Sequence, residues 1–415
     1  MTAALKTAAP KVSLLKPVLF HRAEAALEIL LSFAYPADTT LSRYFRSNPG
    51  MGHTERGIVA EASFSVLRHL RTLRARAELE GGRATPRRLL LAALSCEGRN
   101  LRELEPLLKK DEAIWLASVK RFDDAALSPA ARRNLPDWLS ERLDAEYGEA
   151  ADALIRALNQ SAPLDMRVNL LKTTREDALA AFAADGILAR PGEHAPFALR
   201  LTGKPDVSRH PLFLQGQVEV QDEGSQLLGL LLAPRRGEAV ADFCAGAGGK
   251  TLLLGMLMRN TGRLYAFDVS EKRLEKLKPR LARSGLSNVH PVRIDSESDA
   301  RLKRLRGKMD RVLVDAPCSG LGTLRRNPDL KWRQTPESVT ELAARQRGIL
   351  AAAARLVRPG GTLLYATCSL LREENEAVTE SFLGESADFS LLETRRSLPH
   401  THGTDGFYAA LMRRA

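Results

Sequence analysis

The spacing of apolar residues changes twice along this chain of 415 residues. From about Ala23 to Glu149 they recur every three or four positions, as in the stretch 22–31, which is the spacing of helices that bury one face. This first region is therefore expected to be all-helical. Two further regions with different spacing of apolar residues follow it. The pattern therefore predicts three domains, at residues 1–149, 150–234 and 235–415.

One predicted helix of the first region, 61–79, carries arginines at three-residue intervals: Arg68, Arg71 and Arg74. Residues three apart on a helix lie close together on one face, while the neighbouring apolar residues turn elsewhere. Such a stripe could contact RNA phosphates, and a solvated helix face would have the same pattern. The sequence leaves both interpretations open.

The middle region consists of short mixed segments. We expect a strand at 167–171, a helix at 175–184, loops and edge strands at 191–216, and a run at 218–223 that leads into a helix. Asp222 or Ser225 is the expected N-cap of that helix. The region is interpreted as a small α/β domain.

From about residue 235 strands and helices alternate. The expected strands are 238–243, 263–268, 288–294, 309–315 and 361–367, and the expected helices are 250–259, 271–284 and 336–356. Near-continuous apolar strands between helices predict a mostly parallel sheet covered on both faces. Thr335 is the expected N-cap of the last helix, with Pro336 at its first position. The terminal run 407–412 suits an antiparallel edge strand.

Composition narrows the class of protein. Hydrophobic residues make up 44% of the chain and charged residues 27%, which is typical of a globular protein. No apolar run approaches the roughly 18 residues that span a bilayer, so no membrane segment is expected. The stretch Met1 to Phe20 is broken by lysines and prolines and lacks the apolar block of a secretory signal.

The balance of charges and the spacing of metal-binding residue types add two expectations. Lysine and arginine exceed the acids by 12, which favours a polyanionic partner such as nucleic acid, although an ordinary solvated surface can be as basic. The four cysteines, at 96, 244, 318 and 368, form no Cys-x-x-Cys pair, which fits the reducing cytosol. The eight histidines are scattered, so no metal site is expected.

Two cysteines each close an apolar run that is interpreted as a buried strand. Cys318 stands in Asp-Ala-Pro-Cys-Ser at 315–319, and Cys368 stands in Tyr-Ala-Thr-Cys-Ser at 365–369. Carbon-5 of cytosine is a poor nucleophile, so an enzyme that methylates it first adds a thiolate to carbon-6. Asp315 is placed to serve N3 of the base. A buried cysteine can also pack as a small hydrophobe, and residue types alone do not decide which thiol attacks.

These motifs, together with the runs 240–251, 325–332 and 373–375, resemble the RsmB-type (Sun-domain) bacterial rRNA cytosine-5 methyltransferases. The resemblance implies an α/β class I methyltransferase (Rossmann-like) catalytic domain, a small α/β domain before it and an all-helical, NusB-like RNA-binding domain at the start. It also implies that Cys368 is the nucleophile and that Cys318 assists elimination. Arg167 and Asn169 match an Arg-Val-Asn run of the small domain, with a structural or an RNA-positioning role.

The expected cofactor is S-adenosylmethionine. Its cradle is predicted at the loop after the first catalytic strand and at acids that close later strands: Cys244, Ala245, Gly246, Ala247, Gly248, Gly249, Lys250, Asp268, Asp295 and Asp315. A carboxylate at a strand end can accept ribose hydroxyls, although each acid could instead cap a helix. The family's loop usually reads Ala-Ala-Pro-Gly-Gly-Lys, whereas this chain lacks the proline.

Other classes fit the sequence less well. A P-loop would need glycine at position 244, where Cys244 stands. A dinucleotide dehydrogenase gives no role to the two thiols, and adenine-N6 methyltransferases resemble an Asn/Asp-Pro-Pro-aromatic pattern. The basic loop 320–333 could hold phosphates beside an extruded base, and the basic run 301–308 is interpreted as a solvated helix face. We therefore expect a cytoplasmic, monomeric RNA methyltransferase. The alternative is a non-catalytic RNA-binding factor of ribosome assembly.

Overall fold

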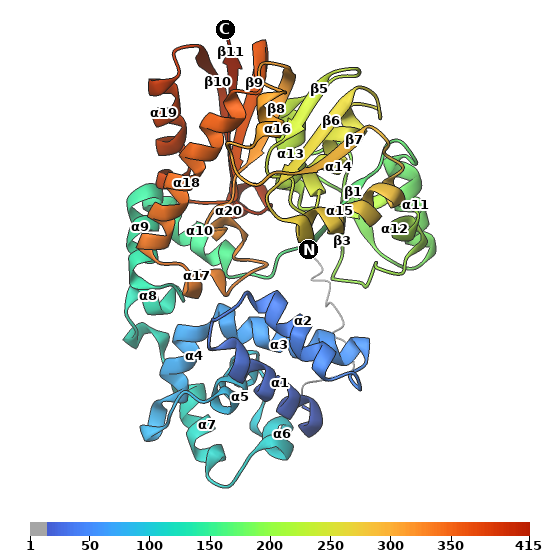
Figure 1. Cartoon of the computed structure of the whole chain (residues 1–415). Helices are drawn as coiled ribbons and strands as arrows, with labels where there is room; N and C mark the ends of the chain where they lie inside the picture. The colour runs from blue at the N-terminus through green and yellow to red at the C-terminus, as the bar shows by residue number, and fades with distance from the viewer. Residues whose placement is uncertain (1–14) are drawn as a thin grey trace, which may run out of the picture. The chain divides into compact units, whose positions relative to one another are not determined.

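The computed structural model describes residues 15–415, which form two compact units (Figure 1). The first unit runs to Ala145 and includes the distant segment Arg326–Arg333, and the second comprises Glu146–Arg325 and Gln334–Ala415. Most of the Met1 to Phe20 stretch, expected to lack a secretory signal, lies outside the described residues. Among the described residues, no helix is long and apolar enough to cross a membrane.

The first unit is helical, as the apolar spacing predicts. Its α-helices are α1 Pro17–Leu30, α2 Ala37–Ser47, α3 His53–Arg68, α4 Leu70–Ala77, α5 Pro86–Cys96, α6 Leu101–Leu104, α7 Glu112–Arg121 and α8 Pro129–Arg132, and α9 Asp137–Tyr147 continues into the second unit. Single 3-10 turns lie at η1 Leu79–Gly81, η2 Glu105–Leu107 and η3 Asp124–Ala126. Phe20, Leu67, Leu89 and Trp115 are among the buried side chains of its core.

The single helix expected at 61–79 is wrong, because the structure interrupts it at His69. The backbone N–H of Thr72, which a continuous helix would direct at Arg68, donates instead to Oδ1 of Asn134. Side chains inserted into the ladder of backbone hydrogen bonds are a known cause of such breaks. The break also removes the free basic stripe, since Arg71 is bonded to Leu135 O and paired with Asp137.

The segment Arg326–Arg333, which contains α17 Leu330–Arg333, supplies the other side chains at this break. Lys331 Nζ donates to the carbonyl of Arg68 at 2.8 Å, and Trp332 Nε1 donates to the carbonyl of Leu67 at 2.7 Å. From the sequence, this segment is expected to belong to a loop that holds phosphates. That assignment is wrong for Lys331, which is 1% exposed and packs in the helical core.

The second unit begins with a small antiparallel sheet of order β2-β3-β1-β4. Its strands are β1 Leu164–Val168, β2 Ala189–Pro191, β3 Ala198–Leu201 and β4 Val218–Val220, with η4 Gly148–Ala150, α10 Ala151–Leu158, α11 Arg175–Ala184 and α12 Pro211–Leu214 around them. The strand expected at 167–171 is largely wrong. It ends at Val168, because Asn169 leaves the strand and donates its side-chain amide to Gly216 O and Ser284 O.

A seven-stranded sheet of order β10-β11-β9-β8-β5-β6-β7 follows. Its strands are β5 Ala239–Asp242, β6 Arg263–Asp268, β7 Val289–Arg293, β8 Met309–Asp315, β9 Val357–Thr367, β10 Phe389–Ser397 and β11 Phe407–Arg414. Strands β5 to β9 are parallel, and β10 and β11 run antiparallel. The chain reverses its direction of growth between β5 and β8, so the expected class I, Rossmann-like fold is confirmed.

Helices cover both faces of this sheet, as expected for parallel strands. On one face lie α13 Glu223–Leu232, α14 Gly249–Leu257 and α15 Glu271–Ser284, and on the other α16 Ala300–Lys303, α18 Pro336–Ala354 and α19 Glu376–Glu385. Short helices η5 Leu321–Thr323, η6 Arg372–Glu374 and α20 Pro399–His402 complete the unit. Asp222 caps α13 and Thr335 caps α18, as two of the sequence predictions state.

The terminal strand differs from its prediction in one respect. β11 is antiparallel, but it is not an edge strand, because β10 pairs with its outer side. Strand β10 is not predicted from the sequence, because its side chains are mostly exposed, Leu391 and Leu392 among them. An edge strand with little buried surface lacks the alternation by which strands are recognised.

Candidate active site

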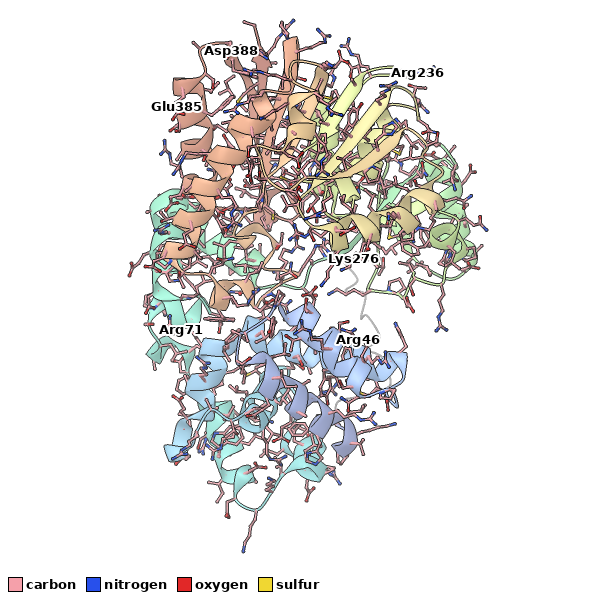
Figure 2. The ribbon with its side chains drawn as sticks, in the orientation of Figure 1. Arg46, Arg71, Arg236, Lys276, Glu385 and Asp388 are labelled. Atoms are coloured by element: carbon pink, nitrogen blue, oxygen red, sulfur yellow. The ribbon has the colours of Figure 1, made fainter. Side chains whose placement is uncertain are left out.

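A pocket of about 950 Å³ lies at the carboxyl ends of the parallel strands, where ligands bind in folds of this type. The glycine loop after β5, the acids that follow β6 and β7, and both strand-end cysteines line it. Lys276, labelled in Figure 2, lines it from α15. One cavity thus brings together predicted site residues that lie up to 124 positions apart, from Cys244 to Cys368.

Cys318 and Cys368 are neighbours in this pocket, with their Sγ atoms 3.4 Å apart. β8 and β9 are parallel and paired so that Asp315 lies opposite Ala366, which carries both following turns to the same edge of the sheet. The hydrogen bond to Cys368, burial and the nearby charge of Cys368 raise the pKa of the Cys318 thiol well above its ordinary value. Cys318 is therefore a thiol that resists loss of its proton.

Lys250, predicted as part of the cofactor loop, turns its side chain toward Asp315. Its Nζ lies 2.7 Å from Oδ2 of that carboxylate and 5.6 Å from the centre of the Phe407 ring. Burial acts to lower the pKa of Lys250, but the charge of Asp315 and the hydrogen bond to it, with smaller effects of Cys368 and Asp242, raise it overall. The lysine is a fixed ammonium beside the two thiols.

The predicted acids differ in their environments. Asp268 is buried, and its two oxygens accept from the backbone N–H groups of Gly246 and Ser270 at 2.8 and 2.7 Å. Asp295 is largely exposed and forms ion pairs with Arg293 and Arg301. Asp268 therefore shapes the glycine loop, whereas Asp295 lies at the rim.

The glycine loop itself is fixed by two left-handed positions. Gly246 has φ +57° and open space where a side chain would project, whereas Gly248 has φ +84° and a Cβ there would lie 2.1 Å from Leu277. Gly248 does not line the pocket, and its role is close packing of the loop on α15. Gly246 leaves room for a ligand.

Asp242, which the sequence analysis missed, closes β5 and also lines the pocket. Its Oδ2 accepts a hydrogen bond from Thr251 Oγ1 at 2.7 Å, and its Oδ1 has no partner among the described residues. Burial raises the pKa of this carboxyl to about 7. The rule that singled out Asp268, an acid at the end of a buried strand, applies equally to Asp242.

Arg167 supports the pocket from the small sheet. It is buried, and its Nη1 donates to the side-chain oxygen of Gln221 and, at 2.8 Å, to the carbonyl of Gly249. A buried guanidinium cannot reach RNA, so of the two roles left open for Arg167 the structural one holds. It ties the start of α14 to β1.

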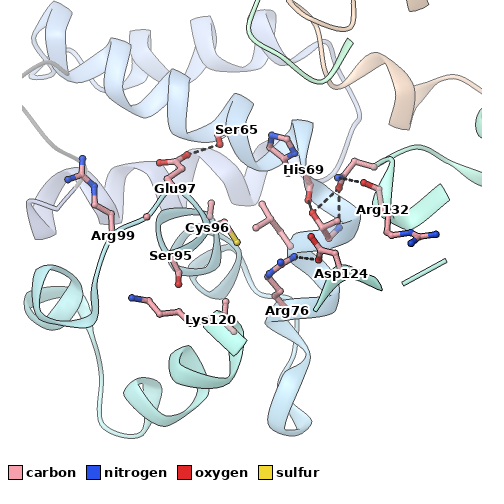
Figure 3. Close-up of a pocket in the computed structure, with 16 residues that line it drawn as sticks. Ser65, His69, Arg76, Ser95, Cys96, Glu97, Arg99, Lys120, Asp124 and Arg132 are labelled. Atoms are coloured by element: carbon pink, nitrogen blue, oxygen red, sulfur yellow. Dashed lines mark hydrogen bonds and ion pairs between the residues drawn. The ribbon is translucent and has the colours of Figure 1, made fainter. Parts of the chain in front are cut away.

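A second cavity, of about 840 Å³, lies within the helical unit (Figure 3). Arg76, Arg99, Lys120 and Arg132 line it, against the acids Glu97 and Asp124. Arg76 pairs with Asp124 at 2.6 Å, whereas Lys120 and Arg132 form no ion pair within residues 15–415. Burial, with Lys331 and Arg68, lowers the pKa of His69 on its wall to about 4, so that imidazole is neutral at pH 7. The lining carries a net positive charge.

No group of three or more histidine, cysteine or acidic residues with metal-binding geometry occurs in the described part of the chain.

Comparison with known proteins gives matches over most of the chain. Residues 229–413 match the 16S rRNA methyltransferase RsmB/F family, and residues 135–208 match the ferredoxin-like domain of RsmF/B-like methyltransferases. The ribosomal RNA small subunit methyltransferase B of Sodalis glossinidius is 37% identical over 308 residues, which cover 72% of this chain and 70% of that protein.

Two solved structures are similar. The crystal structure of PH0851 covers 99% of this chain and 100% of its own, with a TM-score of 0.81 and 26% identity. That of a methyltransferase homolog protein from Pyrococcus horikoshii covers 70% of this chain and 100% of its own, with a TM-score of 0.62 and 31% identity.

Proposed function

The chain belongs to the RsmB/F family of 16S rRNA methyltransferases, and we propose that it transfers a methyl group from S-adenosylmethionine to carbon-5 of a cytosine in small-subunit rRNA. The observation that carries the proposal is the 3.4 Å separation of two thiols in the same cavity as a glycine loop and a lysine–aspartate pair. With such a substrate, the protein works in the cytoplasm, and we propose that it works as a monomer.

Features of the pocket support this cofactor. S-adenosylmethionine carries a sulfonium, an ammonium and a ribose diol but no phosphate, and the pocket offers carboxylates at Asp242, Asp268 and Asp295. The unpartnered oxygen of Asp242 and the open space at Gly246 can each receive a polar group of the ligand. When bound, the cofactor supplies an electrophilic methyl group.

In the proposed mechanism Cys368 is the nucleophile. A thiolate, not a thiol, adds to an electron-poor carbon, and the fixed ammonium of Lys250 beside Cys368 stabilises that charge. The Cys368 thiolate forms a bond to carbon-6 of cytosine, and the electron pair of the ring double bond moves to make carbon-5 nucleophilic. The raised pKa of Cys318 agrees with these separate roles, because Cys318 keeps its proton while Cys368 attacks the base.

Lys250 and Asp315 would together serve N3 of the base. A ring that accepts a thiolate needs a donated proton or hydrogen bond at N3, and an ionised carboxylate only accepts. Lys250 is the donor bonded to Asp315, so the pair holds the proton that the carboxylate lacks. We therefore assign the N3 task to the pair and not to Asp315 alone.

Cys318 would remove the proton from carbon-5 after methylation. Its pKa is raised by the hydrogen bond to Cys368 and by the charge of that group. Once Cys368 is bonded to carbon, both influences are lost and only burial and the charge of Glu374 still raise the pKa. Cys318 then passes its own proton to solvent water, and the resulting thiolate can act as a base. The carbon-5 proton then goes to Cys318, the ring double bond re-forms, and Cys368 leaves as a thiolate.

RNA binding is assigned to the helical unit, and the cavity of Figure 3 is its proposed contact with the RNA backbone. Lys120 and Arg132 have no acidic partner in the described chain, so they can pair with phosphates without breaking an internal ion pair. The excess of 12 basic residues over the whole chain supports a polyanionic substrate.

The decisive experiment is incubation of the purified protein with methyl-labelled S-adenosylmethionine and undermodified 16S rRNA, naked or in small subunits. Methylated positions are mapped by mass spectrometry of nuclease fragments. We expect 5-methylcytosine at a defined site. RNA binding without any transfer would instead favour the ribosome-assembly factor, and transfer to another atom or base would refute the cytosine-5 assignment.

A further inference from the structure

We propose that Glu374 is a positioning residue for both thiols: a buried carboxylate that clamps the turn carrying Cys318 to the turn carrying Cys368. The inference rests on the proposed function for its meaning, because it concerns the geometry that the two-thiol mechanism needs. It adds a residue to which neither the sequence motifs nor the mechanism above gives a task.

The clamp is formed with the serines that directly follow the cysteines. Ser319 donates its backbone N–H to Oε1 of Glu374 at 2.8 Å and its hydroxyl to Oε2 at 2.5 Å. Ser369 donates its hydroxyl to the same Oε2. One carboxylate oxygen therefore joins two turns that are 50 residues apart in the chain, each one residue away from a reactive thiol.

Gln346 of α18 completes the network on the side of Cys318. Its Nε2 donates to Oε1 of Glu374 at 3.0 Å and to the carbonyl of Pro317 at 2.9 Å. The hydroxyl of Tyr365 donates to the backbone carbonyl of Glu374 at 2.6 Å and lies 3.2 Å from Oε1 of Gln346. The residues before and after Cys318 are thus both tied to this one acid.

Glu374 is a buried carboxylate, and its surroundings decide whether it can carry a charge. The side chain is 0% exposed, and an ionised carboxylate in such a place persists only when donors satisfy it. Four donor groups reach it, two of them hydroxyls whose only donated hydrogen bond goes to this acid, so the arrangement suits the charged form. A glutamine has the same shape but would turn an NH₂ group toward a donor.

The charge also acts on Cys318. The pKa of that thiol is raised first by its hydrogen bond to Cys368 and by burial, and Glu374 adds to the effect. A buttress that only stabilised the fold would leave the pH dependence of turnover unchanged. If Glu374 holds the two thiols and also carries a charge near Cys318, removal of that charge changes the pH dependence of turnover.

The first test measures thiol proximity without any RNA. Diamide oxidises two neighbouring thiols to a disulfide, taking up the two electrons and two protons that they lose, and mass spectrometry identifies the Cys318–Cys368 product. Compared with the wild-type chain, E374Q and the milder S369A should form this disulfide at least about tenfold more slowly, since a displacement of about 1 Å can cost 10²-fold in rate. E373Q, in the same 3-10 turn, is the matched control and should match the wild type.

The second test uses methyl transfer. Both variants should lose about 10- to 100-fold in kcat with little change in KM for RNA, because the clamp does not touch substrate. In E374Q the limb of the pH profile that depends on Cys318 should move to lower pH. S369A keeps the charge and should lose rate without that movement.

The outcomes separate the two proposals. Folded E374Q and S369A with wild-type disulfide rate, kcat and pH profile would overturn the role of Glu374. If E374Q does not fold, S369A, which removes one hydroxyl, decides alone. A wild-type protein that forms the disulfide rapidly but methylates no cytosine would refute the proposed function while leaving the clamp intact.

Discussion

The ammonium of Lys250 and the carboxylate of Asp315 form an ion pair of 2.7 Å between the start of α14 and the end of β8. The pair lies in the pocket that both thiols line. Because Lys250 is bonded to Asp315, its proposed role differs from that of the other residues of the glycine loop. The proposed cofactor loop and the proposed base-activating group therefore share one short stretch of sequence.

Replacement of Lys250 by methionine should weaken the activation of the base. Methionine is also unbranched, but it is one atom shorter and lacks the donor and the charge. We therefore expect methyl transfer to fall by about 10²- to 10⁴-fold, the usual worth of a positioned proton donor. The measurement is single-turnover formation of the covalent complex with RNA that contains 5-fluorocytosine, which blocks elimination. K272M, on the exposed face of α15, should behave as wild type. A K250M variant with normal complex formation would remove Lys250 from the mechanism.

The two cysteines should respond differently to alanine. C318A leaves the nucleophile in place and removes the base, so it should trap a denaturation-resistant complex of protein and RNA, visible as a shifted band after electrophoresis in detergent. C368A should form no complex and should lose turnover by on the order of 10⁴-fold or more. The reverse pattern would exchange the two roles.

Asp242 should make stability fall as pH rises. Its pKa is raised from 3.8 to about 7, so the folded state holds a proton that the unfolded state releases above pH 4. The stabilisation is complete below pH 4 and is lost as pH rises through 7. D242N has no carboxyl at this position and lacks this pH dependence. The melting temperature of D242N minus that of the wild type should therefore be several degrees larger at pH 8 than at pH 5. E385Q, an exposed carboxylate, provides the control. A constant difference between D242N and the wild type at both pH values would contradict the assignment.

Charge reversal in the cavity of the helical unit should weaken RNA binding. K120E combined with R132E should lower affinity about tenfold or more and reduce the salt dependence of binding, because fewer counterions are released. Filter binding at two salt concentrations measures both effects. R46E changes charge outside the cavity and is the comparison. Equal losses in R46E and the double variant would mean that the cavity has no special part.

Removal of Trp332 should loosen the helical unit. The indole donates to Leu67 O and packs on the core of that unit, so W332A loses a hydrogen bond and large apolar contacts, about 3–5 kcal/mol for a well-buried tryptophan and less for this partly buried one. Hydrogen exchange should show the effect first at the amides around His69, where α3 gives way to α4. Unchanged protection there would show that the segment Arg326–Arg333 is not needed at the break.

Several elements were predictable because their signals are local. The bounds of β6, β8, α11 and α15 match the expected segments, since strand and helix periods and their caps are written in adjacent residues. The two cysteines were recognised for the same reason, because each directly follows an apolar strand. The missed strand β10 shows the limit of this approach, since its exposed side chains carry no alternating pattern.

The sequence by itself therefore determined the alternation of strands and helices and the placing of two cysteines directly after buried strands. Tertiary structure alone decided that Lys250 pairs with Asp315, 65 residues away, that Glu374 joins Ser319 to Ser369, and that Arg326–Arg333 packs among the helices of the first unit. Periodicity reports which face of an element is buried, but which side chain crosses to which element depends on how the faces pack, and no local pattern carries that information.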